Sequence, residues 1–394
     1  MMLGPTLLVL VSFLFMACSA CPTPDFYADF FLDTTTNSTT NSTTNSTNIL
    51  GSRSYGVPNQ RGQGVDLGPW PITVVDPDNG DEAYIYYCYV DEWAVNNFPP
   101  LFDSAFERWY PALIQSALRF VPDPECGSDH KCACSVNSRP DTLRISSEDG
   151  GSHASVGYQY GSNRAGRHYM RISGYKLGDP DNRVLKVAEA VHELGHVIGL
   201  EHEHQRPDRD EDIDFHCEAL IGFDEAEAKV KAAITAVRDG QPTLHPIPEC
   251  TDPAEARACM INIVCPRPGY AGYYLEIAMP FILGNWFDDR VPFEAKADYV
   301  DWVSIMIYSS YTSATRNGGF PIGATMEGKS KYEGEPNFQI FPGGDRIMDK
   351  RKISQGDIDN VVRLYPKGIV EFPGSDGCDT AEFYDYRGGC DGVI

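Results

Sequence analysis

The sequence predicts an α+β fold that carries a disulfide-rich insert, and three observations support this prediction. First, short runs rich in β-branched and aromatic residues occur in the first half of the chain, which indicates strands. They lie at residues 72–75, 83–90, 142–146 and 168–172. Second, residues 102–118 and 183–198 have apolar side chains at helical spacing. Third, residues 212–300 break this pattern with a Pro- and Cys-rich block.

The predicted helices differ in how clearly their ends and faces can be assigned. Pro111 lies inside the first helix and should kink or divide it, because proline lacks the backbone donor. In the second helix, seven apolar side chains should face the core while the histidines face the opening. They are Val184, Leu185, Val187, Ala188, Val191, Leu194 and Ile198. Near the end of the chain, Ser354 is suited to cap a further helix that runs through Leu364.

The block at residues 212–300 is predicted to be an inserted subdomain. Asp224 can cap a helix that Gly240 ends. Apolar residues recur at helical spacing between them, at Ala226, Val230, Ala233, Ile234 and Val237. Four cysteines are spaced too irregularly for a standard zinc finger and therefore predict disulfide bonds. They are Cys217, Cys250, Cys259 and Cys265.

The N-terminal residues predict export and processing. Residues 1–20, an apolar run followed by small residues, are predicted to be a secretory signal peptide. Residues 21–61 form a Thr-rich pro-segment or linker with too few apolar residues to fold. Its glycosylation acceptors are Asn37, Asn41 and Asn45. We expect removal of this segment near Arg61.

Twelve cysteines fit the oxidising compartment that such an export signal implies. If Cys18 leaves with the signal peptide and Cys21 with the pro-segment, ten remain, an even number compatible with five disulfides. Their connectivity cannot be deduced from spacing. Cys378 and Cys390 lie in a C-terminal tail, residues 367–394, which follows the folded domain predicted at residues 62–366.

Charge and hydropathy exclude two classes of partner. The formal net charge of −24 argues against binding to nucleic acid or to anionic membranes, because both need clustered Lys and Arg. No stretch after the signal peptide approaches the roughly 20 apolar residues of a membrane span. The composition therefore predicts a secreted, extracellular protein whose acidity is that of a solvated surface or favours cationic substrates.

The most informative motif gathers three histidines and a carboxylate. His192 and His196 are four residues apart, so on a helix both can aim a ring nitrogen at one point, with Glu193 beside them as a base. Gly199 can adopt positive φ, end the helix and reverse the chain, which brings His202 to the same point. Three protein ligands leave a fourth position for water, the arrangement of catalytic rather than structural zinc. The spacing predicts a zinc hydrolase.

The full string HELGHVIGLEHEHQRPDRD, residues 192–210, resembles the active-site signature of the astacin family of metzincin zinc metallopeptidases. Residues 304–308, SIMIY, are similar to the Met-turn of that family. Smaller matches occur at residues 119–122 and 364–365. The resemblance covers residues 70–365 apart from the insert. It implies a metzincin-like peptidase of two subdomains, with a twisted N-terminal sheet and a long active-site helix.

The resemblance also implies roles for individual residues. One Zn²⁺ per chain would be bound by His192, His196 and His202. Glu193 would be the general base and acid, and Tyr308 a fifth ligand that swings away to stabilise the oxyanion. Met306 would form a structural floor beneath the metal, although a Met in an apolar run is often only core filler. Glu203 would help to anchor the mature N-terminus, the alternative being a solvated carboxylate.

Several positions depart from the family pattern. Ala117 stands where a disulfide cysteine is usual, and Ile307 replaces the His that often lies between Met and Tyr. A second metal site is conceivable at Cys126, His130, Cys132 and Cys134, but disulfides are favoured there. The pro-segment lacks the usual Phe-x-Gly-Asp latency motif. Acidic residues of the pro-segment or a thiol are the candidates to replace it, namely Asp25, Asp29, Asp33 and Cys21.

These features predict a secreted zinc-dependent endopeptidase, expected to be a monomer, that acts on protein or peptide substrates. By the family resemblance, an extended substrate would add as a strand to a sheet edge near residues 153–158. The alternative is a catalytically silent secreted binding glycoprotein with the same fold. A metal-dependent hydrolase of a non-peptide ester or amide is a third possibility. The insert is expected to cover one flank of the cleft.

Overall fold

The computed structural model describes most of the predicted folded domain. The described residues are 55–56, 67–73, 81–126, 132–148, 151–173, 180–283, 294–295, 300–317, 320–330, 336, 340 and 353–367. The predicted signal peptide, the glycosylation acceptors, the cleavage site near Arg61 and nearly all of the C-terminal tail lie outside them. The fold is α+β, as the sequence predicts.

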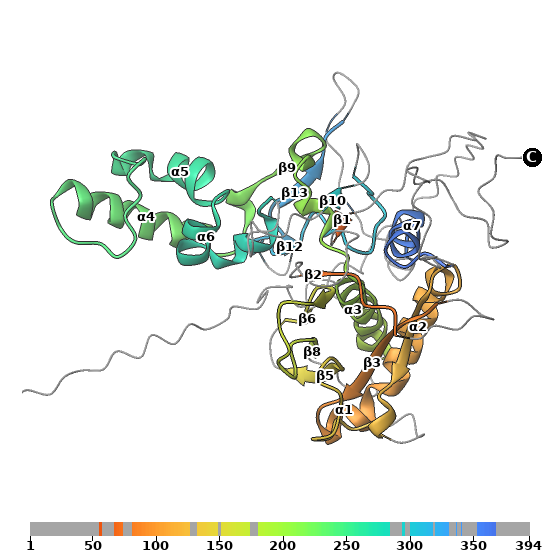
Figure 1. The fold of residues 1–394 in the computed structure, drawn as a ribbon. Coiled ribbons are helices and arrows are strands. Elements are labelled where there is room, and N and C mark those ends of the chain that lie inside the picture. The colour runs from red at the N-terminus through yellow and green to blue at the C-terminus, as the bar shows by residue number, and fades with distance from the viewer. Residues whose placement is uncertain are drawn as a thin grey trace, which may run out of the picture.

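A five-stranded sheet with the order β4-β3-β5-β8-β6 forms the first half of the domain (Figure 1). Four strands run parallel, and the short edge strand β6 is antiparallel to β8. The strands are β3 (Ala83–Tyr89), β4 (Leu118–Pro122), β5 (Leu143–Glu148), β6 (His153–Ala154) and β8 (Tyr169–Ser173). Three of the four predicted β-rich runs therefore form central strands. The prediction of a strand at 72–75 is wrong where the structure describes it, because residues 71–73 form no strand.

Two helices lie between strands β3 and β4 in the chain. Helix α1 (Glu92–Asn97) is capped by Asp91, whose side chain accepts from the backbone N of Ala94. Helix α2 (Pro99–Leu113) begins at two prolines, which lose no intrahelical bond at that position. The predicted helix at 102–118 is thus displaced, because its last residue already belongs to β4. Parallel pairing of β4 with β3 outweighs the helical periodicity there.

Helix α3 (Pro180–Ile198) packs against α2 and contacts β8 and β6 of the sheet (Figure 1). Among its described side chains, those facing the core include Val187, Val191, Leu194 and Ile198, as predicted. The Trp109 indole of α2 donates to the Val191 carbonyl over 2.9 Å. The face opposite this core is therefore available for polar side chains.

The C-terminal end of α3 is tied down by residues distant in sequence. The Trp70 indole donates to the Val197 carbonyl over 2.7 Å, and the Tyr365 hydroxyl donates to the Ile198 carbonyl over 2.6 Å. The backbone N of Trp70 donates in turn to the Tyr365 hydroxyl. Carbonyls at the end of a helix have no partner within it, so these bonds replace water at a buried helix end.

Outside this sheet, the described strands form short antiparallel pairs, and helix α7 lies near the end of the chain. The pairs are β1 (Tyr55–Gly56) with β10 (Glu294–Ala295), β2 (Leu67–Gly68) with β7 (Tyr158–Gln159), β9 (Ile213–Phe215) with β13 (Met326–Gly328), and β11 (Arg316–Asn317) with β12 (Phe320–Pro321). Helix α7 (Gln355–Leu364) begins with a capping box in which Ser354 and Asp357 each accept from the other's backbone N. The cap predicted at Ser354 is confirmed.

The predicted insert is helical and projects away from the sheet (Figure 1). It contains α4 (Phe223–Arg238), α5 (Ala256–Cys259), a π-helical turn (Met260–Val264), α6 (Pro268–Tyr274) and a 3-10 helix (Glu276–Phe281). The insert also contains the short 3-10 turns Cys217–Ala219 and Pro253–Glu255. Three more lie before it, at Pro124–Cys126, Glu203–Gln205 and Arg209–Glu211. Gly240 has a φ of 70° after α4, as its predicted role requires. The cap residue is Gly222, whereas Asp224 lies in the first turn.

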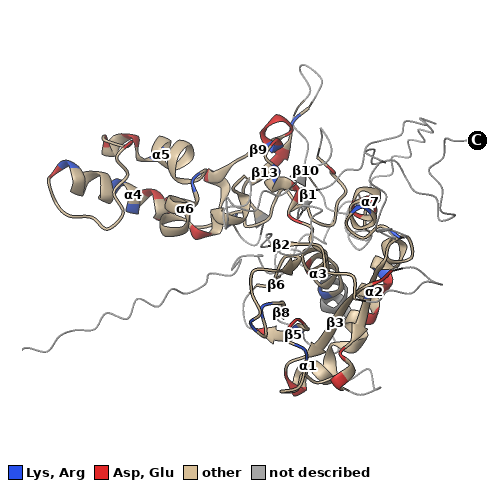
Figure 2. Ribbon diagram, viewed as in Figure 1, with Lys and Arg blue, Asp and Glu red and all other residues tan. Residues whose placement is uncertain are grey.

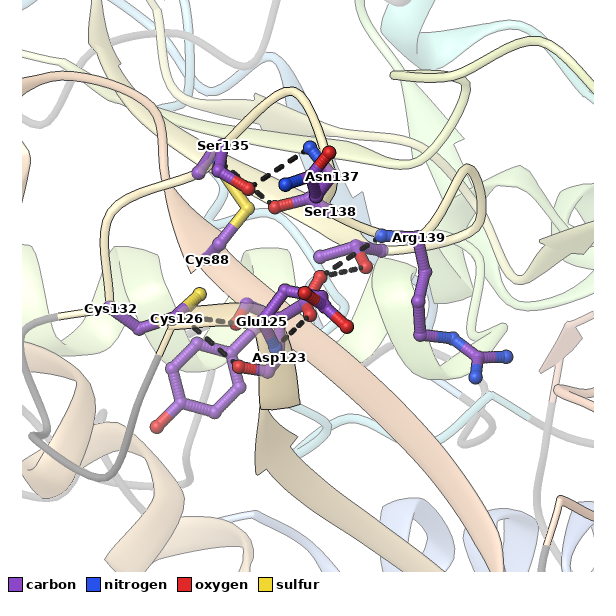
Figure 3. Close-up of a disulfide and its surroundings, with 12 residues drawn as sticks. Cys88, Asp123, Glu125, Cys126, Cys132, Ser135, Asn137, Ser138 and Arg139 are labelled. Carbon is purple, nitrogen blue, oxygen red and sulfur yellow. Dashed lines mark hydrogen bonds between the residues drawn. A yellow bond between two sulfur atoms is a disulfide. The ribbon is translucent and has the colours of Figure 1, made fainter.

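Four disulfides join the described cysteines. Two staple the insert, Cys217–Cys265 and Cys250–Cys259. The other two lie in the sheet half, Cys88–Cys134 and Cys126–Cys132. Asp123 lies close to these cysteines (Figure 3). Its buried carboxylate accepts from Thr142 Oγ1 over 2.6 Å. The cysteines considered for a second metal are thus disulfide-bonded, and the alternative is wrong for them.

The described surface shows neither a membrane-spanning helix nor a single basic face. Within the described ranges, every helix is too short or too polar to cross a bilayer. Acidic side chains lie on α1 and α2 at one end of the molecule and on α4 and α5 at the other (Figure 2). Lys and Arg are interspersed among them.

Candidate metal centre

Helix α3 and the turn after it bring the three predicted histidines together. His192 and His196 are one turn apart on the face of α3 that points away from the core. Gly199 has a φ of 119°, and its backbone N donates to the Gly195 and His196 carbonyls. A left-handed conformation of this kind is easy only for glycine. The chain then reverses, as predicted, and presents His202 from the opposite side.

The three Nε2 atoms converge on one point. His202 Nε2 lies 3.1 Å from His192 Nε2 and 3.1 Å from His196 Nε2, and all three candidate ligand atoms lie within 4.8 Å of one another. Ligand nitrogens about 2.1 Å from a tetrahedral zinc ion are about 3.4 Å apart. The spacing of the three rings therefore fits a single metal ion of that size.

The opposite nitrogen of each ring is occupied by an acceptor, which determines where the proton resides. His192 Nδ1 donates to the Ile305 carbonyl over 2.8 Å, and His196 Nδ1 donates to the Leu200 carbonyl over 2.9 Å. A carbonyl oxygen cannot donate, so both protons must be on Nδ1. The Nε2 lone pairs of these rings are then free for a metal.

Burial keeps these imidazoles neutral. It lowers the pKa of His192 to about 4 and that of His196 to about 3, and the backbone acceptors only partly oppose the effect. The pKa of His202 is also well below its usual value, first because of burial and then because His196 lies nearby. Only a neutral imidazole can bind a metal ion through Nε2. The site is therefore prepared for a cation at neutral pH.

Glu193 and Tyr308 are the other two predicted catalytic residues. Glu193 follows His192 on α3 and is only 1% exposed. The Tyr308 ring is buried, with its centroid 4.5 Å from that of His202 and 6.2 Å from that of His192. A phenol thus lies beside the rings whose nitrogens converge.

Met306 packs closely against a glycine of α3. A Cβ atom on residue 195 would overlap Met306 Sδ and lie 3.4 Å from the Trp109 ring. Gly195 is therefore needed at a position where helix propensity disfavours glycine by about 1 kcal/mol. This requirement escaped the sequence analysis, although a glycine inside an otherwise strong helix is a signal of close packing.

A buried carboxylate holds the two residues that precede Met306. Asp357, at the start of α7, accepts from Ser304 Oγ over 2.6 Å and from the Ile305 backbone N over 3.0 Å. Ile305 is also the residue whose carbonyl holds His192. Burial raises the pKa of Asp357 to about 6, and the neighbouring Asp301 contributes to this rise. Sequence analysis recognised the helix start here but not its link to the metal site.

Glu203 is buried rather than solvated. It is 3% exposed and accepts from Arg206 and from the Asp301 backbone N, over 3.0 Å and 3.1 Å. Burial raises its pKa to about 7, against the lowering effect of Arg206. The anchoring of a mature N-terminus stays a prediction. Beyond it, Arg206 pairs with Asp208 and Arg209 with Asp210, so this loop is rich in ion pairs.

The expected substrate edge lies next to the metal site. Strand β6 borders the five-stranded sheet, and the Gly157 backbone N donates to the His196 carbonyl over 2.9 Å. The β2–β7 pair continues from this point. Residues 153–158 therefore connect the sheet edge to the helix that carries two of the three histidines.

Comparison with a family of known proteins agrees with this geometry. Residues 89–231 match the model of a peptidase family, described as astacin. No curated protein matches the chain significantly. Similar solved structures include high choriolytic enzyme 1, a hatching enzyme zinc-protease from Oryzias latipes (medaka fish), at 15% identity, 75% coverage of this chain and 94% of that chain, with a TM-score of 0.39.

Two structures of myroilysin are also similar, each at 15% identity. They cover 76% and 77% of this chain and 97% and 93% of theirs, with TM-scores of 0.38 and 0.35. The family match includes α3, the three histidines and the beginning of the insert. Over this segment, the chain resembles the astacin family of peptidases.

Proposed function

We propose that the protein is a secreted zinc-dependent endopeptidase. The observation that carries this proposal is the convergence of three neutral imidazole Nε2 atoms, with the buried residue Glu193 directly after His192 in the chain. The match of residues 89–231 to the astacin peptidase family supports it. Four disulfides among the described cysteines support export to an oxidising compartment.

The residues can divide the reaction among them. Zinc bound to His192, His196 and His202 would lower the pKa of water in its fourth position to about 7 and polarise the scissile carbonyl. Glu193 would take a proton from the attacking water and return it to the leaving amine. Tyr308 would donate to the oxyanion of the tetrahedral intermediate. An extended substrate would pair with β6 and so present its carbonyl to the site.

Zinc analysis and proteolysis test the proposal together. We expect purified mature protein to contain about one zinc per chain and to cleave a denatured protein such as casein. Glu193→Gln should bind zinc and fold normally, while kcat falls by about 10³-fold or more. The matched control is Glu225→Gln, an exposed carboxylate on α4. Unchanged turnover in Glu193→Gln would refute the role of Glu193.

Peptide-library digestion separates this function from the alternatives. A peptidase yields defined cleavage sites, whereas a silent binding glycoprotein gives none at any concentration. Hydrolysis of esters without peptide cleavage would favour the non-peptide hydrolase. N-terminal sequencing of secreted protein tests the expected processing near Arg61, and a start at Cys21 would contradict it.

A further inference from the structure

The third histidine is held differently from the other two. His192 and His196 donate to backbone carbonyls. His202 Nδ1 instead lies 2.8 Å from Oε1 of Gln205, a side chain that is only 6% exposed. An amide presents either an oxygen or an NH₂ group, so this partner must itself be oriented before it can determine the tautomer of His202.

The orientation comes from the end of the insert. Gln205 Nε2 donates to the Ile282 carbonyl over 3.3 Å. Because that carbonyl can only accept, the NH₂ group must face Ile282 and Oε1 must face His202. The proton of His202 is then on Nδ1, and its Nε2 lone pair points toward the other two rings. A backbone carbonyl 77 positions beyond Gln205 thus controls which nitrogen of His202 is available.

The carbonyl of Ile282 is one of three consecutive carbonyls bound in this way. We call Pro280–Ile282 the exit segment, because it ends the helical part of the insert. His204 Nε2 donates to the Pro280 carbonyl over 2.9 Å, and the Arg209 guanidinium donates to the Phe281 carbonyl. Every carbonyl of the exit segment therefore bonds to a side chain from the stretch that directly follows the third histidine.

Apolar contacts fix the same segment against the site. The buried Phe281 ring meets the Tyr308 ring edge-on at a centroid distance of 5.7 Å and stacks on Phe215 at 5.2 Å. The insert behind it has its own core and two disulfides. A cross-linked subdomain is thus docked on the side of the metal site opposite α3.

We propose that Gln205 is a positioning residue through which the exit segment of the insert orients His202 toward the metal. The insert is then part of the metal centre. This inference rests on the proposed zinc site but not on proteolysis, because its effects appear in metal affinity and in the His202 proton. A hydrogen-bonding partner behind a metal-binding histidine typically changes metal affinity by 10- to 100-fold.

Three variants separate the hydrogen bond from packing. Gln205→Met preserves the shape but removes both polar contacts, so we expect zinc affinity, measured by chelator competition, to fall about 10- to 100-fold. Gln205→Glu still accepts from His202 Nδ1, and both of its oxygens accept in any orientation, so affinity should stay at or above that of the wild type. Gln241→Met, at an exposed glutamine, is the control and should have no effect.

Cobalt-substituted protein reports on the ring proton directly. The structure predicts three exchangeable, cobalt-shifted imidazole N–H signals, one from each histidine. Gln205→Met should broaden or remove only the signal of His202, whereas Gln205→Glu should retain it. Wild-type affinity and three intact signals in Gln205→Met would overturn the proposal. Equal loss of affinity in both variants would also overturn it, because packing would then be the cause.

The contribution of the insert requires a double comparison. Replacing Cys250 and Cys259 by alanine loosens the insert without touching the site. In protein that retains Gln205, this double replacement should weaken zinc binding by about threefold or more. In the Gln205→Glu variant it should have no effect, because either oxygen of Glu can accept from His202 without a carbonyl to orient it. Equal effects in both backgrounds would exclude a route through Gln205. Failure of wild-type protein to bind zinc would instead refute the proposed function, and bound zinc without proteolysis would refute only peptidase activity.

Discussion

The two sides of the metal centre are built in different ways. On the helix side, His192 and His196 come from a 19-residue helix packed against the main core, and backbone carbonyls hold their rings. On the loop side, His202 follows a tight turn, and a side chain linked to the insert holds its ring. The rings of the helix side are thus held by backbone carbonyls of the main core, whereas the ring of the loop side depends on a side-chain amide that a disulfide-linked subdomain orients.

This difference teaches that three similar ligands need not be equally robust. Backbone carbonyls within a packed core move only if the core moves. A side-chain amide and a stapled subdomain can be loosened separately from the sheet. The helix side should therefore persist without metal, and the loop side should depend on it more strongly.

Metal removal should have the largest effect. At free zinc 1,000 times above Kd, bound metal stabilises the folded state by about 4 kcal/mol, so chelation should lower the free energy of unfolding by that amount. Hydrogen exchange should then increase more at residues 200–206 and 280–282 than at 187–196. Equal increases on both sides would contradict the comparison.

Loss of the Cys250–Cys259 disulfide should come next. The bond joins residues nine positions apart. In the chain-entropy account, removing a disulfide that closes a loop of that size lowers the free energy of unfolding by about 3 kcal/mol. We expect the insert to unfold at lower denaturant concentration, measured by exchange of α4 amides, while amides of β3 and β5 keep their protection. Simultaneous loss of protection in both regions would show that the two halves are one cooperative unit.

Replacing glycine by alanine should lower stability in α3 but not in the insert. Gly195→Ala in α3 places a Cβ against Met306 Sδ and should destabilise the protein by about 2 kcal/mol through overpacking. Gly269→Ala in α6 meets nothing within 4 Å and should be neutral or stabilising by up to about 1 kcal/mol. Urea unfolding measures both, and a neutral Gly195→Ala would remove the packing argument.

Mild acid should have the smallest effect. A histidine with depressed pKa stays neutral as pH falls through 6.5 and takes up its proton only near its folded pKa, about 4 for His192 and about 3 for His196. Protons should therefore compete weakly with zinc between pH 7 and 6, and affinity should change by less than about threefold. Chelator competition across this range checks the expectation. A tenfold loss per pH unit would indicate rings that titrate normally.

Much of the site could be predicted because it is local in sequence. The i, i+4 spacing of His192 and His196 and the positive φ of Gly199 follow from helix and turn geometry alone. The Ser354 cap and the faces of α3 follow for the same reason. The displaced end of α2 shows the limit, since the pairing of β4 with β3 decided that region. The absence of a strand at residues 71–73 was also not predicted.

The sequence by itself determined the fold class, the family signature and the three histidines, because each depends on residues close together in the chain. Tertiary structure alone decided the disulfide partners, the need for glycine at residue 195 and the role of Gln205. Each of these depends on a contact between residues from separate elements. Local spacing can suggest which atoms bind a metal, but only the folded chain brings together the groups that orient them.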